Sequence, residues 1–248
     1  VHVFVQPVMR LPQRQVRFFE LYGRIRVKPG RYIPASRYIE VAKAEDKIDE
    51  IDRLILLECL NMLDRRDMRD KDTSFFVNIS TTTLSNMEFM KQLLSFVSRR
   101  KKLASHLIFE LRQDDFIRMN AKTRKILSAM AKAGCCFSLD NVTKLTINVP
   151  ELSAFQIRFV KFDSAFLHQL SREDKGPTKI WKVKRELEKA NIAFVVEKIE
   201  SEYMLRELLD YDLHYGQGFL FGKPDLQGAY LGKTQATKST DYLKRVSA

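Results

Sequence analysis

The chain has 248 residues, of which 45% are hydrophobic, so it can bury a large core, and its length suits a single α/β barrel domain. The net charge of +12 favours anionic partners such as nucleic acid, an anionic membrane surface or a phosphate-bearing ligand. No apolar run approaches the roughly 20 residues that span a bilayer, and the start of the chain lacks the pattern of a signal peptide. The three cysteines and four histidines have no metal-type spacing, which argues against zinc and predicts reduced thiols.

Short β-rich runs recur along the chain, and most are separated by helix-length amphipathic stretches. The runs cover residues 1–8, 16–23, 74–80, 106–112, 135–140, 158–163, 193–199 and 216–222. This alternation is typical of repeated βα units and predicts an α/β fold, a TIM-like (β/α)8 barrel. The segment between the first two runs is too short for a parallel crossover, so we expect the first strand to be antiparallel to the second.

The intervals between the strands are predicted to be helices over residues 34–63, 82–102, 120–133, 179–190 and 201–210. Asn120 and Ser201 are suitable N-caps, and Gly134 is a suitable stop. We expect one barrel domain over residues 1–232, followed by a C-terminal tail over residues 233–248. Because the chain begins inside an expected strand, we also expect it to be a fragment of a longer protein.

Polar side chains occur near the end of nearly every expected strand. They are Gln6, Glu20, Asn78, Glu110, Asp140, Lys161, Asp163, Glu197, Glu200 and Gln217. The carboxyl ends of the strands form the active site in barrels of this kind, so these side chains are expected to meet there. Converging acids require positive charge, and ligands that are all oxygen suit Mg²⁺, Mn²⁺ or Ca²⁺. The alternative is that each acid caps a helix or pairs with a lysine individually.

Two basic residues have specific expected positions. Lys161 lies between phenylalanines in FVKFD, so its side chain should point into the barrel, where it is either a structural counter-ion or an acid/base group. Arg24 follows Glu20 by four residues and offers a fork of donors to a phosphate. A solvated surface arginine is the alternative for Arg24.

Several motifs occur in an order and spacing that suggest a known family. QPVMRL resembles Q-P-I-V-D-L, Glu20-Leu21-Tyr22 stands at the position of E-A-L, and VNIS resembles V-N-L-S. FELR is similar to E-I-T-E, VKFD to K-I-D, VEKIES to A-E-G-V-E-T, and GQGFLFGKP to Q-G-Y-L-F-G-K-P. From Gln6 to Pro224 the chain thus resembles the EAL family, the cyclic di-GMP phosphodiesterase domains and their degenerate receptor relatives.

The resemblance implies a role for each matching residue. It implies cyclic di-GMP binding by Gln6, Glu20, Leu21, Arg24, Asp140, Asp163, Glu200, Gln217 and Gly218, with Arg24 at the phosphate-contacting arginine. It implies metal ligation by Glu20, Asn78, Glu110 and Asp140, and it makes Lys161 the candidate base, with Glu197 as a second catalytic residue.

The chain departs from the family in one loop and in the name-giving motif. Catalytic members carry D-D-F-G-T-G, in which the two aspartates hold a pair of cations, whereas this chain has Asp140, Asn141 and no following glycines. Asn141 is neutral, so we expect either one weakened site for Mg²⁺, Mn²⁺ or Ca²⁺, or no metal. Tyr22 replaces the leucine of the name motif and is expected to reshape the pocket floor.

We therefore expect a degenerate EAL domain that binds cyclic di-GMP as a receptor with little or no hydrolysis. An active or slow metal-dependent cyclic di-GMP phosphodiesterase and a protein-interaction scaffold without nucleotide binding are the alternatives. The resemblance implies bacterial signalling in motility, flagellar or biofilm control, a cytoplasmic location, a signalling or assembly partner and a possible dimer. No nucleic-acid partner is expected, because no nucleic-acid-binding fold is recognised. Membrane contact is expected only through regions outside this fragment.

Overall fold

Strands pair side by side into a closed barrel in the computed structural model, which describes residues 1–64, 73–226 and 230. In this part of the chain the barrel strands are β1 (His2–Arg10), β2 (Gln15–Lys28), β4 (Ser74–Asn78), β5 (Leu107–Arg112), β6 (Cys136–Val142), β7 (Ile157–Asp163), β8 (Ala193–Glu197) and β9 (Tyr215–Gln217). Their order is β1-β9-β8-β7-β6-β5-β4-β2, and pairing of β1 with β2 closes the ring. The predicted eight-stranded α/β barrel is confirmed.

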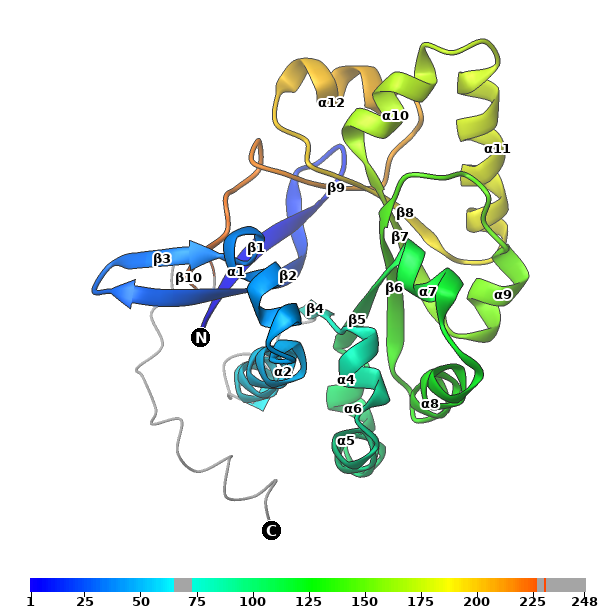
Figure 1. The fold of residues 1–248 in the computed structure, drawn as a ribbon. Helices are drawn as coiled ribbons and strands as arrows, with labels where there is room; N and C mark the ends of the chain where they lie inside the picture. Colours follow the sequence, from blue (N-terminus) through cyan, green and yellow to red (C-terminus); the bar gives the residue numbers. More distant parts are fainter. Residues whose placement is uncertain (65–72, 227–229, 231–248) are drawn as a thin grey trace.

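The first strand runs against both of its barrel neighbours. β1 is antiparallel to β2, with Gln6 opposite Glu20, and it is also antiparallel to β9. The other barrel pairs are parallel, which confirms the predicted antiparallel first strand. Two short strands lie outside the ring: β3 (Arg31–Pro34) pairs with β2, and β10 (Asp225–Leu226) pairs with β1. The hairpin of β2 and β3 projects away from the barrel (Figure 1).

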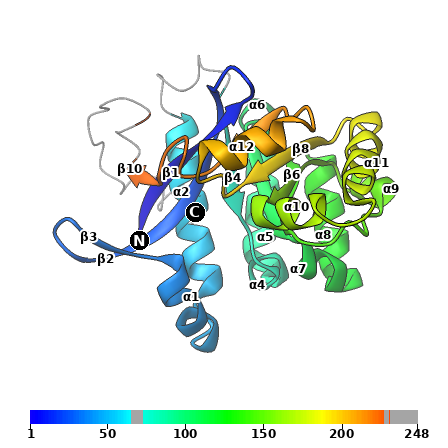
Figure 2. The ribbon, with the colours of Figure 1, turned by 90° about the horizontal axis from the view of Figure 1, so that it is seen from above.

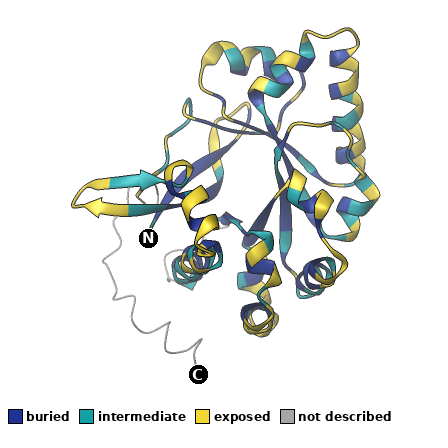
Figure 3. Ribbon diagram, viewed as in Figure 1, coloured by how far each residue is buried: buried dark blue, intermediate teal, exposed yellow. Residues whose placement is uncertain are grey.

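Helices surround the barrel, as Figures 1 and 2 show, and α10, α11 and α12 lie on the side away from the projecting hairpin. The described helices are α1 (Ala35–Ala44), α2 (Ile48–Asp64), α4 (Thr81–Ser85), α5 (Met87–Arg99), α6 (Lys101–Ala104), α7 (Gln113–Arg118), α8 (Ala121–Lys132), α9 (Val149–Ala154), α10 (Ser164–Ser171), α11 (Gly176–Lys189) and α12 (Glu202–Leu209). The strands are buried within the barrel, whereas the projecting β2–β3 hairpin and the outer helix faces are largely exposed (Figure 3).

Two helices that were predicted to be continuous are divided in the structure, so these two predictions were wrong. The helix expected over 34–63 divides into α1 and α2, because Asp46 takes a left-handed backbone conformation with φ 50° between them. The helix expected over 82–102 divides into α4, α5 and α6, and Asn86 caps α5 by accepting a hydrogen bond from Phe89 N. The N-caps Asn120 and Ser201 are confirmed by hydrogen bonds to the first turns of α8 and α12.

The predicted domain boundary at residue 232 and the predicted tail over 233–248 lie outside the described residues. Within the described residues, no helix combines the length and the apolar character needed to cross a membrane.

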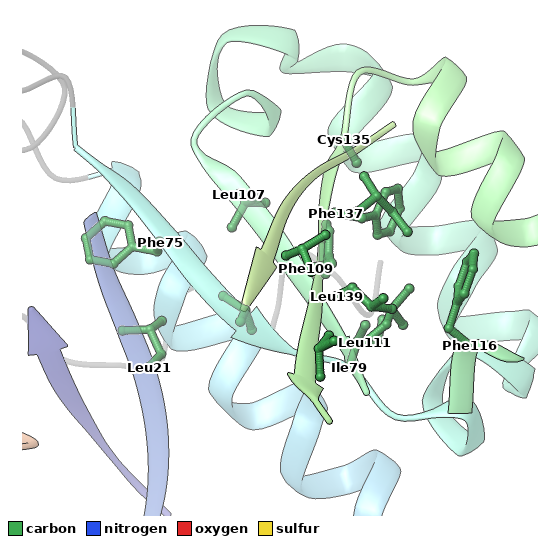
Figure 4. Packing of buried hydrophobic residues seen from close by; sticks show 14 of the residues in the cluster. Leu21, Phe75, Ile79, Leu107, Phe109, Leu111, Phe116, Cys135, Phe137 and Leu139 are labelled. Atoms are coloured by element: carbon green, nitrogen blue, oxygen red, sulfur yellow. The ribbon is translucent and has the colours of Figure 1, made fainter. Parts of the chain in front are cut away.

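Strand alternation divides the core into two clusters. Outward-facing side chains pack against the helices and include Leu21, Phe109 and Leu139, which Figure 4 shows in this cluster. Inward-facing side chains fill one end of the barrel with an apolar plug made by Val8, Phe18, Phe76, Ile108 and Val195, against which Cys136, Phe159 and Tyr215 pack.

The inward-facing layer above this plug is polar. Side chains two residues apart on a strand share a face, so each plug residue is followed by a second inward position. These positions are Gln6, Glu20, Asn78, Glu110, Ser138, Lys161, Glu197 and Gln217. Since β1 runs the opposite way, Gln6 precedes its plug residue Val8 instead of following it. The fold thus brings seven of the ten predicted polar residues into one layer, and Asp140, Asp163 and Glu200 lie outside it.

Candidate functional site

Lys161 lies at the centre of the polar layer and is fully buried. Its Nζ lies 2.5 Å from Glu20 Oε2, to which it donates a hydrogen bond, and 2.7 Å from Glu110 Oε1. The contact with Glu110 is an ion pair by distance but lacks the angles of a hydrogen bond. The ammonium also lies 4.9 Å from the centroid of the Phe76 ring in the plug below. One buried cation therefore serves two buried carboxyl groups.

This arrangement separates the protonation of the two glutamates. Burial opposes ionisation of Glu20, but the charge of Lys161 and hydrogen bonds from Lys161 and Gln217 lower its pKa below the ordinary value. Burial, together with the charge of Glu20, raises the pKa of Glu110 well above its ordinary value. Burial alone would lower the pKa of Lys161, but the carboxylates of Glu110 and Glu20 raise it well above its ordinary value. The layer thus favours an ionised Glu20, a charged Lys161 and a protonated Glu110.

Gln217 and Tyr22 form a polar floor over this ion pair. Gln217 Nε2 lies 2.7 Å from Glu20 Oε2, 3.1 Å from Gln6 Oε1 and 3.2 Å from the Tyr22 hydroxyl. Gln6 Nε2 in turn donates to the carbonyl of Gly222 at 2.8 Å. These contacts join β1, β2 and β9 where the barrel closes, and they include the Tyr22 hydroxyl.

A pocket of about 480 Å³ opens above the floor. This volume lies within the range of small-molecule sites. Its lining comprises Gln6, Tyr22, Gly23, Arg24, Pro34, Ala35, Ser36, Glu197, Lys198, Glu200, Gln217, Gly218, Phe219 and Pro224. Glu20, Glu110 and Lys161 do not line it, and Glu20 is hydrogen-bonded to two residues that do, Tyr22 and Gln217.

Arg24 is the basic residue on the β2 side of the pocket. Its guanidinium carbon lies 4.3 Å from the centroid of the Phe4 ring, and Phe4 packs edge-on against Tyr32 with 5.0 Å between ring centroids. Cation–π stacking on Phe4 restrains the guanidinium of this pocket-lining residue. Gly218 forms the opposite wall, where an added Cβ would meet Ile199 O at 2.0 Å. That wall has no room for a side chain.

A second lysine, Lys198, lies where β6, β7 and β8 end. Its Nζ lies 2.7 Å from Asp163 Oδ2, 3.4 Å from Asn141 Oδ1 and 3.7 Å from Glu197 Oε1. Asp163 Oδ1 also caps α10 by accepting from Ala165 N and Phe166 N. Burial would raise the pKa of Asp163, but the hydrogen bond and charge of Lys198 lower it below its ordinary value. Asp163 is therefore an ionised partner of Lys198.

Glu197 interacts electrostatically with both Lys161 and Lys198. Burial and the charge of Asp140 raise its pKa to about 9 against the weaker opposing charges of Lys161 and Lys198. Glu197 is therefore protonated at neutral pH, and it supplies a neutral carboxyl to the pocket wall.

The expected metal ligands have the right chemistry but not the right arrangement. Asp140 Oδ1 and both carboxyl oxygens of Glu110 are buried without a hydrogen-bond partner, as oxygens that face a cation would be. However, Glu20 and Glu110 are paired with Lys161, and among residues 1–64, 73–226 and 230 no three His, Cys, Asp or Glu side chains are grouped so as to hold a metal ion. The side chains in this arrangement do not fit a divalent ion.

Of the residues expected to contact a ligand, Glu20, Leu21, Asp140 and Asp163 do not line the pocket, and the Leu21 side chain points away from it. The side chain of Leu21 is buried in the outward-facing core, because it alternates with Glu20 and Tyr22 along β2. The expected ligand contact by the Leu21 side chain is therefore wrong. Glu200 lines the pocket and is exposed, and Asn78 lies at the end of β4 opposite Glu110.

Sequence reasoning missed Lys198 and the exposed rim residue Phe219. Lys198 occupies the position of the glycine in A-E-G-V-E-T, and this mismatch was the available signal. Phe219 follows Gly218 in GQGF and is 53% exposed at the pocket edge.

Comparison with known proteins identifies relatives of the chain. The family model described as EAL domain matches residues 1–224. The cyclic di-GMP phosphodiesterase PdeA of Borreliella burgdorferi is 19% identical over 223 residues, which cover 90% of this chain and 33% of PdeA. The chain thus spans about a third of the length of this curated relative.

Solved structures share the fold. The PaMucR phosphodiesterase in its c-di-GMP complex has a TM-score of 0.78 at 21% identity, with 92% of each chain covered. The Xanthomonas citri FimX EAL domain in complex with c-diGMP has a TM-score of 0.77 at 16% identity, covering 94% of this chain and 90% of that one.

Replacement of Lys161 tests whether its charge compensates the buried carboxyl groups of Glu20 and Glu110. In Lys161→Met, Glu20 loses its counter-ion, so we expect a loss of about 3 to 5 kcal/mol in the free energy of unfolding. Urea denaturation at pH 7 measures this free energy of unfolding. Lys184 is also fully buried, but its partners Glu188 and Asp212 are half-exposed or exposed, so Lys184→Met should cost less than about 1 kcal/mol. Equal losses in both variants would contradict the proposed charge balance.

A pH series tests the protonation of Glu197. Its pKa of about 9 in the folded chain lies above the ordinary 4.5, so the folded state retains a proton that the unfolded chain releases between these values. Its contribution to stability is complete below about pH 4.5 and is lost as pH rises toward 9. Between pH 5 and pH 9, Glu197→Gln should therefore lose less free energy of unfolding than the wild type.

The control for this series is Glu202→Gln. The hydrogen bond from Arg14 lowers the pKa of Glu202, so this variant should follow the wild type between pH 5 and pH 9. Parallel curves for the wild type and Glu197→Gln would show that Glu197 is ionised throughout.

Proposed function

Because the chain belongs to the EAL domain family, we propose that its pocket binds cyclic di-GMP and that the domain serves as a receptor with little or no hydrolysis. The observation that carries this proposal is the separation of the pocket from the buried carboxylates. Arg24 lines the pocket, while Glu20 and Glu110 lie beneath it and are paired with Lys161.

The pocket offers the groups that a cyclic dinucleotide needs. Arg24 supplies a guanidinium for a phosphate. Because its side chain already stacks on Phe4, it loses little conformational entropy when a ligand binds. Phe219 offers an aromatic surface at the rim on which a base can stack. Lys198 adds positive charge to the same wall, and the net charge of +12 attracts an anionic ligand to the domain.

The same geometry disfavours hydrolysis. Attack on a phosphodiester needs an activated water beside the reacting phosphorus, and in this family that water is activated by a pair of cations. Here Asn141 lacks the charge of an aspartate, and the Tyr22 side chain lies between the pocket and Glu20. Lys161 is held by two glutamates below the floor, so it does not reach a ligand in the pocket as a base.

Two alternative functions predict different metal binding, nucleotide affinity and turnover. A slow phosphodiesterase would bind one Mg²⁺, Mn²⁺ or Ca²⁺ at Glu20, Asn78, Glu110 and Asp140, and this would require Lys161 to leave Glu20 and Glu110. A scaffold without nucleotide binding would show neither affinity nor turnover. The proposal includes a cytoplasmic signalling role with a protein partner or a second copy of the chain, as expected from the family.

Calorimetric titration with cyclic di-GMP tests the proposal. We expect the same affinity in EDTA as in Mg²⁺ or Mn²⁺, and no linear dinucleotide after overnight incubation when the mixture is separated by chromatography. Arg24→Ala should weaken binding at least about tenfold, because a charge-assisted hydrogen bond to phosphate contributes about 1.5 to 3 kcal/mol. Arg14→Ala is the control, since Arg14 is an exposed arginine paired with Glu202.

Cleavage that requires Mg²⁺ or Mn²⁺ would favour the phosphodiesterase. Absence of binding at millimolar nucleotide would favour the scaffold.

A further inference from the structure

Three oxygen-bearing side chains from three adjacent strands converge on the ammonium of Lys198. Asn141 lies on β6, Asp163 ends β7 and Glu197 ends β8, and each has an oxygen within 3.7 Å of Nζ. The Asp163 carboxylate, the Asn141 amide oxygen and the Glu197 carboxyl oxygen are oxygen donors, the type of ligand that a hard divalent cation prefers. In this protein a side chain supplies the cation.

The backbone at Lys198 is held in a conformation that disfavours a side chain. Its φ of 60° is in the left-handed region, which glycine adopts readily and residues with a Cβ adopt rarely. The Ser164 hydroxyl donates to the Lys198 carbonyl at 2.8 Å, and Ile199 N donates to Gln217 O at 3.0 Å, so the local chain path is fixed. Glycine would relieve the backbone strain here, whereas lysine adds a side chain that reaches the oxygens of Asn141, Asp163 and Glu197.

The Lys198 side chain supplies a positive charge that stays covalently attached to the protein. A lysine ammonium brings one positive charge and three donors on a covalent tether, whereas a metal ion binds according to its concentration. Both would occupy the space between Asn141 and Asp163, so the two exclude each other. Lys198 also lines the pocket, so its positive charge lies near a ligand that binds there.

We propose that Lys198 is a built-in cation that takes the place of a divalent ion between Asn141, Asp163 and Glu197, and that it makes anion binding in the pocket independent of metal. The exclusion of metal stands on the geometry alone. The effect on a phosphate-bearing ligand rests on the proposed function.

Manganese binding to the free protein tests the exclusion without any nucleotide. Calorimetry or the electron paramagnetic resonance of free Mn²⁺ measures the affinity of the whole chain. Lys198→Gly removes the ammonium and the backbone strain together, so Mn²⁺ should bind at least about tenfold more tightly than to the wild type. Adding Asn141→Asp to Lys198→Gly restores a carboxylate and should tighten binding further.

Two control variants separate charge from local disturbance. Lys198→Arg keeps the positive charge and should bind Mn²⁺ as weakly as the wild type. Lys179 is a lysine of nearly equal exposure that also pairs with a carboxylate, Glu173, so Lys179→Ala should stay within twofold of the wild type. Circular dichroism verifies that each variant is folded.

The inference is overturned if folded Lys198→Gly and its double variant with Asn141→Asp both bind Mn²⁺ within twofold of the wild type. A second readout uses cyclic di-GMP: wild-type affinity should not change between EDTA and Mn²⁺, whereas that of Lys198→Gly should rise at least about fivefold with Mn²⁺. Failure of every variant to bind nucleotide would remove the proposed function, while the Mn²⁺ titration would still decide the role of Lys198.

Discussion

Burying several carboxyl groups in one layer of a barrel requires positive charge inside that layer, and this constraint shapes the site. Lys161 meets it with one ammonium between Glu20 and Glu110, which leaves one carboxyl ionised and favours protonation of the other. Lys198 meets it at the adjacent strand ends by pairing with Asp163. Both cations are side chains of the protein itself.

The arrangement also divides the site into two levels. The ion pairs lie below a floor of Tyr22 and Gln217, and the pocket with Arg24 lies above it. We propose that binding of an anionic ligand depends on the upper level and that hydrolysis would depend on cations at the lower one. In this proposal, Tyr22 in place of the family's leucine separates recognition from hydrolysis while the barrel stays intact.

The sequence alone predicts the convergence of the polar residues, because strand alternation places Glu20, Glu110 and Lys161 on the inward face once the barrel is recognised. The same alternation shows why Leu21 leaves the site, although the family motif had suggested a contact. The local sequence pattern predicts neither the division between α1 and α2 at Asp46 nor the position of the Lys198 ammonium. Each depends on a left-handed backbone conformation, and for Lys198 also on which oxygens three separate strands bring within reach.

The most direct test is anomalous diffraction from crystals grown with cyclic di-GMP and Mn²⁺. The account predicts a nucleotide phosphate at the Arg24 guanidinium, Lys198 Nζ in contact with Asp163, and no manganese peak between Asn141, Asp163 and Glu197. A manganese ion at that position, with the Lys198 side chain turned into solvent, would contradict it.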